Sequence, residues 1–112
     1  MNLHSEPMAG AALLIRVESE NLDAGNAGQF KSLIQPLLES SHCVVIDMSA
    51  LSFVDSSGLG ALLSCLRTMN NRNGTLHLVG LAKPVRALFE LVRMHRIFSL
   101  HDTIAAALAA CP

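Results

Sequence analysis

The sequence predicts an α/β fold in one domain, residues 1–112, with a central, mostly parallel sheet of four to five strands and about four helices. Three observations lead to this prediction. Short, β-branched apolar runs alternate along the chain with longer segments of helical period, as in parallel sheets with crossover helices. The chain of 112 residues has the length of a single domain. Its apolar content of 51% is enough for a core without disulfide or metal staples.

The expected strands are short and apolar. The run CVVIDM is continuously apolar up to Asp47, which is typical of a central parallel strand. His77 alternates with Leu76 and Leu78, which predicts an exposed position on its strand. Residues 1–8 carry no clear signal, and both a frayed end and a weak edge strand stay open. The segments predicted as strands are residues 11–17, 43–48, 75–79 and 97–100.

The expected helices each have one apolar face. Asp23 is a candidate N-cap for the first, and Pro36 predicts a kink or a break within it. Asp102 or Thr103 is expected to cap the last helix, which is rich in alanine and closes the chain. The first three helices are predicted over residues 23–39, 56–70 and 84–93. The side chains expected to face the core are, in the first helix, Phe30, Leu33, Ile34, Leu37 and Leu38; in the second, Leu59, Leu62, Leu63, Leu66 and Met69; in the third, Val85, Leu88, Phe89 and Val92; and in the last, Ile104 and Leu108. In the loop of residues 49–55, Leu51, Phe53 and Val54 are also expected to point into the core.

Charge is divided unevenly along the chain. The net charge is −1, but residues 1–55 hold two cations and seven acids, whereas residues 56–112 hold six cations and two acids, which gives −5 and +4. A dipolar surface of this kind can orient a protein partner, and ordinary solvated faces are the alternative. The absence of Trp and Tyr argues against nucleic-acid binding by base stacking.

The three cysteines, Cys43, Cys65 and Cys111, are widely spaced and lie among apolar residues. No Cys-x-x-Cys or Cys/His ligand spacing is present, so no metal site and no cofactor is predicted. We expect thiols that pack as small hydrophobic groups in a reducing compartment. No apolar run approaches the roughly 20 residues of a membrane span, and no cation precedes Arg16 as in a signal peptide. A cytoplasmic location is therefore expected.

Residues 54–60, with the sequence VDSSGLG, lie where a loop passes into the second predicted helix. Small polar residues at such a junction commonly cap the helix. Two features go beyond capping. Two serines follow the acid, although one capping residue would be enough. Gly58 and Gly60 each cost about 1 kcal/mol of helix propensity relative to alanine, and their missing side chains predict a backbone open to close approach.

Enzyme motifs are incomplete in this segment. A P-loop requires a lysine after its final glycine, but Gly60 is followed by Ala61 and Leu62. The GxSxG nucleophile elbow is absent. The five histidines are scattered, and none is adjacent to Ser56 in the sequence. We therefore predict no catalytic residue and a protein that is not an enzyme.

The stretch CVVIDMSALSFVDSSGLGALLSCL resembles the core signature of STAS domains, in particular the anti-sigma factor antagonists of bacteria. The likeness extends from about Leu13 to Leu108. It is carried by the strand and loop around Asp47 and by the apolar-Asp-Ser-Ser-Gly-Leu-Gly run. Two departures are that residues 18–21 replace the family's usual glycine before Leu-Asp, and that Arg93 stands where a turn glycine is common after the third helix.

This resemblance implies a phosphorylation site at Ser56, the serine directly after Asp55. Ser57 is the neighbour, matched to a position with a local structural role, and Gly58 and Asp23 belong to the surroundings. In this family the unphosphorylated antagonist binds an anti-sigma factor that is also a serine kinase of the histidine-kinase-like ATPase fold, and the sigma factor is released for transcription. Phosphorylation inactivates the antagonist, and a metal-dependent serine phosphatase restores it.

The outer face of the second helix, with Ser64 and Arg67, is the expected partner-binding surface. Arg72 is a further candidate, and solvated arginines are the alternative for both. A regulator of this kind is expected to bind partner proteins, not to bind nucleic acid and not to span a membrane. The alternative function is a non-phosphorylated scaffolding STAS subunit of a lipid-transport or signalling complex, in which the serines only cap the helix.

Overall fold

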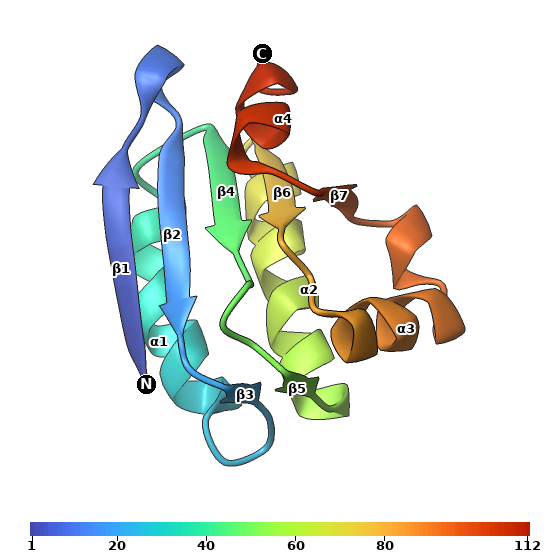
Figure 1. Cartoon of the computed structure of the whole chain (residues 1–112). Helices are drawn as coiled ribbons and strands as arrows, with labels where there is room; N and C mark the ends of the chain where they lie inside the picture. Colours follow the sequence, from blue (N-terminus) through green and yellow to red (C-terminus); the bar gives the residue numbers. More distant parts are fainter.

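The computed structural model describes every residue from Met1 to Pro112. Its main sheet has the strand order β1-β2-β4-β6-β7, and four helices accompany it (Figure 1). This confirms the predicted α/β class and the mostly parallel sheet. The elements are β1 (Asn2–Pro7), β2 (Leu13–Glu18), β3 (Asn21–Leu22), α1 (Ala27–Leu38), β4 (Cys43–Asp47), β5 (Phe53–Val54), α2 (Ser56–Asn71), β6 (Thr75–Val79), α3 (Lys83–Leu91), β7 (Ser99–His101) and α4 (Ile104–Ala109), with short 3-10 helices η1 (Ala9–Ala11) and η2 (Met94–Arg96).

The pairing of the strands makes the sheet mixed. β2, β4, β6 and β7 run parallel to one another, whereas β1 runs antiparallel to β2, with Asn2 opposite Glu18 and Pro7 opposite Leu13. The N-terminal residues therefore form an edge strand. β3 and β5 pair in parallel as a separate two-stranded sheet beyond the ends of the main strands (Figure 1).

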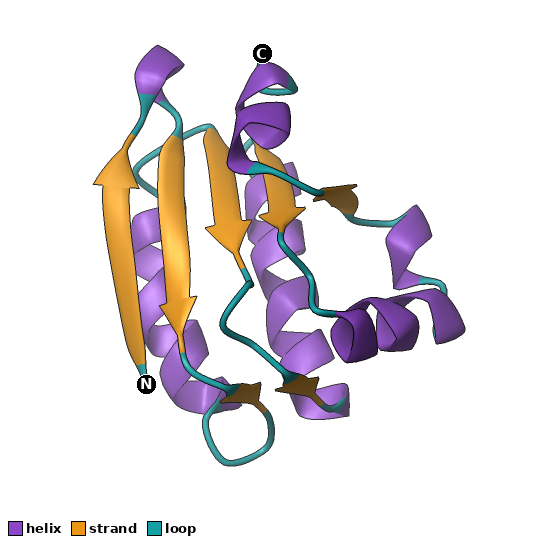
Figure 2. Cartoon of the chain, in the orientation of Figure 1, coloured by secondary structure: helices purple, strands orange, loops and turns teal.

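The two faces of the main sheet carry two apolar layers, because successive side chains of a strand point to opposite sides. α1 and α2 lie behind the sheet in Figure 2, and α4 lies on its opposite face. The layer against α1 and α2 contains Ile15, Val44, Ile46, Leu76 and Leu78 together with Phe30, Ile34, Leu62 and Met69. The smaller layer under α4 contains Leu14, Val45, Val79 and Ala107.

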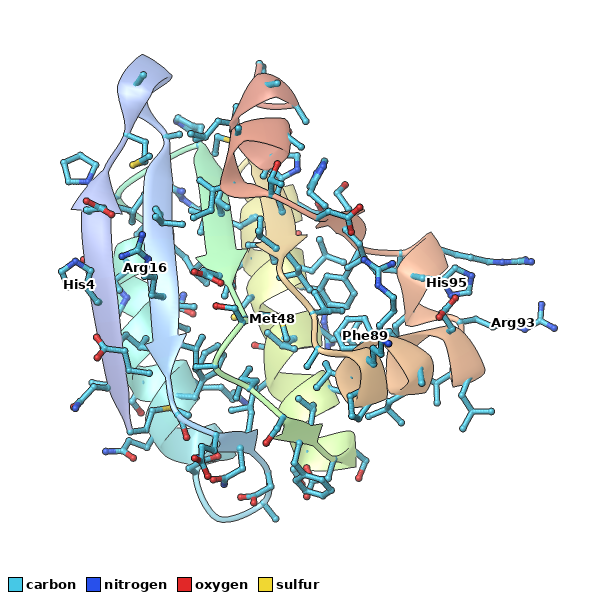
Figure 3. All side chains as sticks on the ribbon, viewed as in Figure 1. His4, Arg16, Met48, Phe89, Arg93 and His95 are labelled. Carbon is cyan, nitrogen blue, oxygen red and sulfur yellow. A yellow bond between two sulfur atoms is a disulfide. The ribbon has the colours of Figure 1, made fainter.

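Several predicted core positions are at the surface instead. In α1 the sheet is faced by the i, i+4, i+8 row of Phe30, Ile34 and Leu38, so Leu33 lies on the flank and is exposed. Val92 is exposed because α3 ends at Leu91, before the predicted stripe is complete. Phe53 is 55% exposed, since the two-residue strand β5 turns Val54 inward and Phe53 outward. Met48 and Phe89 are buried and point into the interior (Figure 3).

The first helix differs from the prediction at both ends. It begins at Ala27 with Asn26 in the N-cap position, because Asp23 belongs to the preceding loop. It also runs unbroken through Pro36. The proline ring removes one backbone hydrogen bond, which the carbonyl group of Ser32 would have accepted. Ser32 is exposed to solvent, and the helix ends two residues after Pro36. A break at Pro36 is therefore not required.

Two residues of the central strands contradict their predicted environment. His77 is only 5% exposed, because β6 is a central strand and α4 covers the face on which His77 lies. Cys43 and Cys111 form a disulfide, whereas free thiols were expected, and Cys65 alone is a free, buried thiol. The two bonded cysteines are 68 residues apart, so their proximity depends on the fold. No helix combines the length and the apolar character needed to cross a membrane.

Candidate functional site

The start of α2 lies beside β5, at the end of the molecule where β4 and the other parallel strands finish (Figure 1). Val54 anchors this point as a buried residue of β5. Asp55 follows with an extended backbone in the N-cap position, and Ser56 is the first residue of the helix. The buried strand and the capped helix thus fix the position of the Ser56 backbone from both sides.

The Asp55 carboxylate holds two segments together. Its Oδ1 accepts a hydrogen bond of 3.0 Å from the Gly58 backbone N–H, which caps α2. Its Oδ2 accepts one of 3.1 Å from the backbone N–H of Ala24, in the loop before α1. The Gly58 bond, and then that of Ala24, favours the charged form and lowers the pKa of Asp55 below its usual value. Asp55 is therefore an ionised structural clamp at neutral pH.

Asp23 shapes the loop that Asp55 clamps. Its Oδ1 accepts from the backbone N–H of Gly25 and its Oδ2 from the amide of Asn21, both at 2.9 Å. The Asn26 side chain closes the loop by accepting from the Asp23 backbone N–H at 2.9 Å. Asp23 is thus connected to Ser56 only through the loop and Asp55. The two asparagines were not predicted as part of the site, because nothing in their spacing indicates that they bond Asp23.

Gly58 is required by internal packing. A Cβ at this position would overlap the carbonyl oxygen of Leu22 and approach Cγ1 of Val54 to 2.9 Å. The prediction of a backbone open to an approaching partner is therefore wrong for Gly58, since β3 of the same chain occupies that space. Gly60 is different: it is exposed, and an added Cβ would meet nothing within 4 Å.

Ser56 and Ser57 are both exposed, and neither is the N-cap of α2. The capping role that could have explained the paired serines belongs to Asp55. Phe53 is exposed three residues before Ser56 and adds an aromatic surface to this end of the molecule. The arrangement presents a hydroxyl group at the start of a long helix, on a support that does not need that hydroxyl.

The outer face of α2 continues away from Ser56. Positions 56, 60, 64 and 67 are separated by four, four and three residues, so they fall on one side of a helix. Ser64 is half-buried and Arg67 is exposed. Arg72 is instead used within the chain, because its guanidinium donates to the carbonyl oxygens of Leu38, Ser41 and Glu39 at 2.7, 3.0 and 2.8 Å. Arg72 thus satisfies free carbonyl groups at and after the end of α1, and we no longer count it as part of the candidate partner surface.

Comparisons with known proteins give a consistent result. The family model described as STAS domain matches residues 7–107. The anti-sigma F factor antagonist of Paenibacillus polymyxa is 26% identical over 110 residues, which cover 96% of this chain and 94% of the relative. The crystal structure of an anti-sigma factor antagonist from Mycobacterium paratuberculosis has a TM-score of 0.85 at 25% identity and is covered over 92% of its length by 98% of this chain. The Bacillus cell fate determinant SpoIIAA in its phosphorylated form has a TM-score of 0.70 at 21% identity, with 96% of this chain and 97% of that chain covered, which shows a shared fold. The chain belongs to the STAS domain family.

Proposed function

We propose that this protein is an anti-sigma factor antagonist that binds an anti-sigma factor serine kinase when unphosphorylated and is inactivated by phosphorylation of Ser56. The full-length similarity to the antagonist of Paenibacillus polymyxa supports the coarse role. The observation that carries the finer proposal is the exposed Ser56 at the first position of α2, with its capping role already filled by Asp55. Its hydroxyl is therefore free for modification without loss of a helix cap.

Phosphorylation of Ser56 would perturb the domain itself little. The added group carries about −1.5 to −2 charges, and the N-terminus of a helix favours an anion by about 0.3–1 kcal/mol. The ionised carboxylate of the adjacent Asp55 opposes this. Because the two effects have opposite signs and the site faces solvent, we expect the fold to stay unchanged.

The two arginines considered for the partner surface, Arg67 and Arg72, are not placed to neutralise such a phosphate. Arg67 lies on the same face of α2, but eleven residues at 1.5 Å of rise place it about 16 Å along the helix. Arg72 is held at the end of α1 by three carbonyl groups. Neither arginine would therefore screen the phosphate from a partner that covers this end of the helix.

A partner that covers Ser56 would respond strongly to that charge. Burial of an uncompensated anion in an interface costs several kcal/mol, since the anion loses its hydration. A penalty of about 4 kcal/mol weakens binding roughly a thousandfold. Exposed Phe53 supports a partner surface beside the serine, since aromatic residues are enriched at interfaces. Ser64 and Arg67 extend the proposed surface along α2.

The proposed cycle needs two further proteins. The kinase would have the histidine-kinase-like ATPase fold and use ATP, whose γ-phosphoryl group it would transfer to the Ser56 hydroxyl. A metal-dependent serine phosphatase would remove the group by hydrolysis. The scaffolding alternative requires neither enzyme, and its explanation of the serines as helix caps does not fit α2, because Asp55 is the cap.

Phosphorylation by the cognate kinase tests the proposal. The unphosphorylated protein serves as bait for the kinase, and the captured kinase is incubated with the protein and ATP. We expect one phosphate per chain in wild type and in Ser57→Ala, and none in Ser56→Ala, by intact-mass spectrometry. Ser57→Ala is the matched control, because both serines are exposed neighbours on the first turn of α2.

Two outcomes would contradict the proposal. Phosphate on Ser57 in the Ser56→Ala variant, with normal release of the kinase, would move the switch to the neighbouring serine. A stable complex with an ATP-binding partner that transfers no phosphate to either serine would favour the scaffolding function.

A further inference from the structure

A second group of reactive side chains lies at the opposite end of the sheet from Ser56. Cys43 is the first residue of β4, Cys111 follows α4, and His77 lies in the middle of β6. The sulfur atoms of Cys43 and Cys111 are bonded, and one donor atom of each of the three side chains lies within 4.8 Å of the others. Cys43 and His77 are buried, whereas Cys111 is half-buried next to the C-terminus. This group has no part in the proposed phosphorylation.

The ring of His77 is held in place by hydrogen bonds. Its Nδ1 lies 3.0 Å from Nε2 of His101, and its Nε2 lies 3.3 Å from the hydroxyl oxygen of Thr75. Thr75 is the register partner of Cys43 across β4 and β6, so Nε2 is directed along the sheet to the side of Cys43. The imidazole ring of histidine is a common metal ligand in proteins, through either of its nitrogen atoms.

Two thiolates and one imidazole form a donor set typical of zinc. Zinc takes sulfur at about 2.3 Å and nitrogen at about 2.0–2.1 Å in a tetrahedral arrangement, which places the donors roughly 3.5–3.8 Å apart. Donor atoms within 4.8 Å of one another reach this spacing by small side-chain movements. The two sulfurs are available as ligands only when they are not bonded to each other, because the thiolate is the form that binds the metal.

We propose that reduction of the Cys43–Cys111 disulfide opens a zinc site formed by the two thiolates and Nε2 of His77, and that oxidation closes it. In this site His101 keeps its hydrogen bond to Nδ1 and orients the ring, as partners of metal-bound histidines usually do. Three protein ligands leave a fourth position for water, on the half-exposed side of Cys111.

The chemical balance of the switch is simple. A dithiol reductant transfers two electrons and two protons to the disulfide, so that the sulfur–sulfur bond breaks, two thiols form and the dithiol becomes a disulfide. Binding of Zn²⁺ then releases the two thiol protons. In the reverse direction a disulfide oxidant takes two electrons from the zinc-bound thiolates and two protons from the solvent, so that it becomes a dithiol, the sulfur–sulfur bond of the protein forms again and Zn²⁺ leaves.

Either state ties the C-terminal segment to the sheet. Cys111 follows α4, which is also held by Ala107 against Leu14, Val45 and Val79. A sulfur–sulfur bond and a sulfur–zinc–sulfur bridge would fasten the same two positions. The reduced, metal-free chain would keep only the small apolar contact. The segment after α4 can therefore be crosslinked to the sheet in two alternative ways, by the disulfide or by zinc, and the redox state selects between them.

Zinc titration of the oxidised and reduced protein tests this proposal. The full chain is reduced with a phosphine, desalted without oxygen and titrated with Zn²⁺ against a chromophoric chelator. We expect one zinc per chain in the reduced protein and none in the oxidised protein, with native mass spectrometry showing the loss of two protons per bound metal. Co²⁺ in place of Zn²⁺ should give the thiolate-to-metal charge-transfer band of a cysteine-ligated site.

Variants assign the ligands. Cys111→Ser should lower zinc affinity by more than about 100-fold, because removal of a ligand should exceed the 10–100-fold effect of losing an outer partner. His101→Gln should produce the smaller effect of about 10–100-fold. Cys65→Ala is the matched control, since burial raises the pKa of the Cys65 thiol to about 12 and keeps it protonated. Its zinc affinity should equal that of the wild type.

The proposal fails if the reduced protein binds zinc no better than the oxidised protein, or if Cys111→Ser binds like the wild type. Circular dichroism of each variant separates loss of a ligand from loss of the fold. If Cys43→Ser does not fold because its side chain is buried, Cys111→Ser still decides the result, since Cys111 lies outside every helix and strand.

Discussion

Ser56 and Cys43 lie at opposite ends of the main sheet, and the chain supports them in opposite ways (Figure 1). At the Ser56 end the support is internal and the hydroxyl is outside: Asp55, Gly58 and Leu22 fix the backbone, and the serine faces solvent. At the Cys43 end the reactive groups are themselves the support, since the disulfide joins β4 to the segment after α4. A modification at the first end should leave the fold unchanged, whereas a chemical change at the second should alter stability.

The largest effect expected is on binding at the Ser56 end. Ser56→Asp places a permanent charge beside Asp55 on the surface that we propose the kinase covers. Affinity for the kinase should fall by up to about a thousandfold, corresponding to roughly 4 kcal/mol. Isothermal titration calorimetry measures the affinity, and circular dichroism should stay close to wild type. Loss of secondary structure in this variant would contradict the idea that the serine is independent of its support.

The Cys43 end should show the reverse behaviour. Cys111→Ser removes the crosslink and should lower the free energy of unfolding of the oxidised protein by about 2–4 kcal/mol, because the unfolded chain regains the freedom of a long loop. Urea denaturation without reductant measures this change. The rate of Ser56 phosphorylation should stay the same. A changed rate would show that the two ends are coupled through the sheet.

A pair of glycines separates the support at the Ser56 end from the exposed surface. Gly58→Ala forces a methyl group against the Leu22 carbonyl and should destabilise the protein by about 1–3 kcal/mol. Gly60→Ala, two residues later on the same helix, meets open space and should stabilise it by about 0.5–1 kcal/mol. Thermal unfolding of the two variants gives the comparison. Equal effects would mean that β3 does not pack on Gly58 as the structure shows.

Local sequence signals were sufficient for much of the fold. Strand β6 has the predicted bounds, and β4 and α2 each differ by one residue at the C-terminal end. The capping role of Thr103 was one of the two predicted alternatives, and its side chain accepts from the Ala106 N–H. These features depend on residues that are close in the sequence. They were predictable because propensity, apolar period and capping all act over a few residues.

Contacts between distant segments account for what was missed. The burial of His77 requires α4 to fold back over β6, and the disulfide joins residues 68 positions apart. Arg72 bonds carbonyl groups more than 30 residues earlier in the chain. The role of Gly58 depends on Leu22, which the parallel pairing of β3 and β5 brings to it. None of these contacts has a local signal, so the motif indicated Ser56 but not the support beneath it.

Arg93 is distant in the sequence from both Ser56 and Cys43, and its replacement should have only a small effect on stability. Its φ of 61° is in the left-handed region, and its side chain projects from the molecule beside His95 (Figure 3). Arg93→Gly should raise the free energy of unfolding by about 0.5–1 kcal/mol, because glycine adopts this conformation without steric cost but loses more chain entropy on folding. Arg96→Gly is the matched control at an exposed helical position and should lower it by a similar amount.

These two arginine variants also test the separation of the two ends. They change global stability in opposite directions without touching Ser56, Cys43 or His77. Phosphorylation of Ser56 and zinc binding by the reduced protein should therefore be the same in both, by intact-mass spectrometry and chelator competition. If either activity followed stability instead, it would depend on partial opening of the chain. An activity that is equal in both variants depends only on the local arrangement of its own groups. The contrast between the exposed serine and the disulfide of buried Cys43 and half-buried Cys111 requires this result.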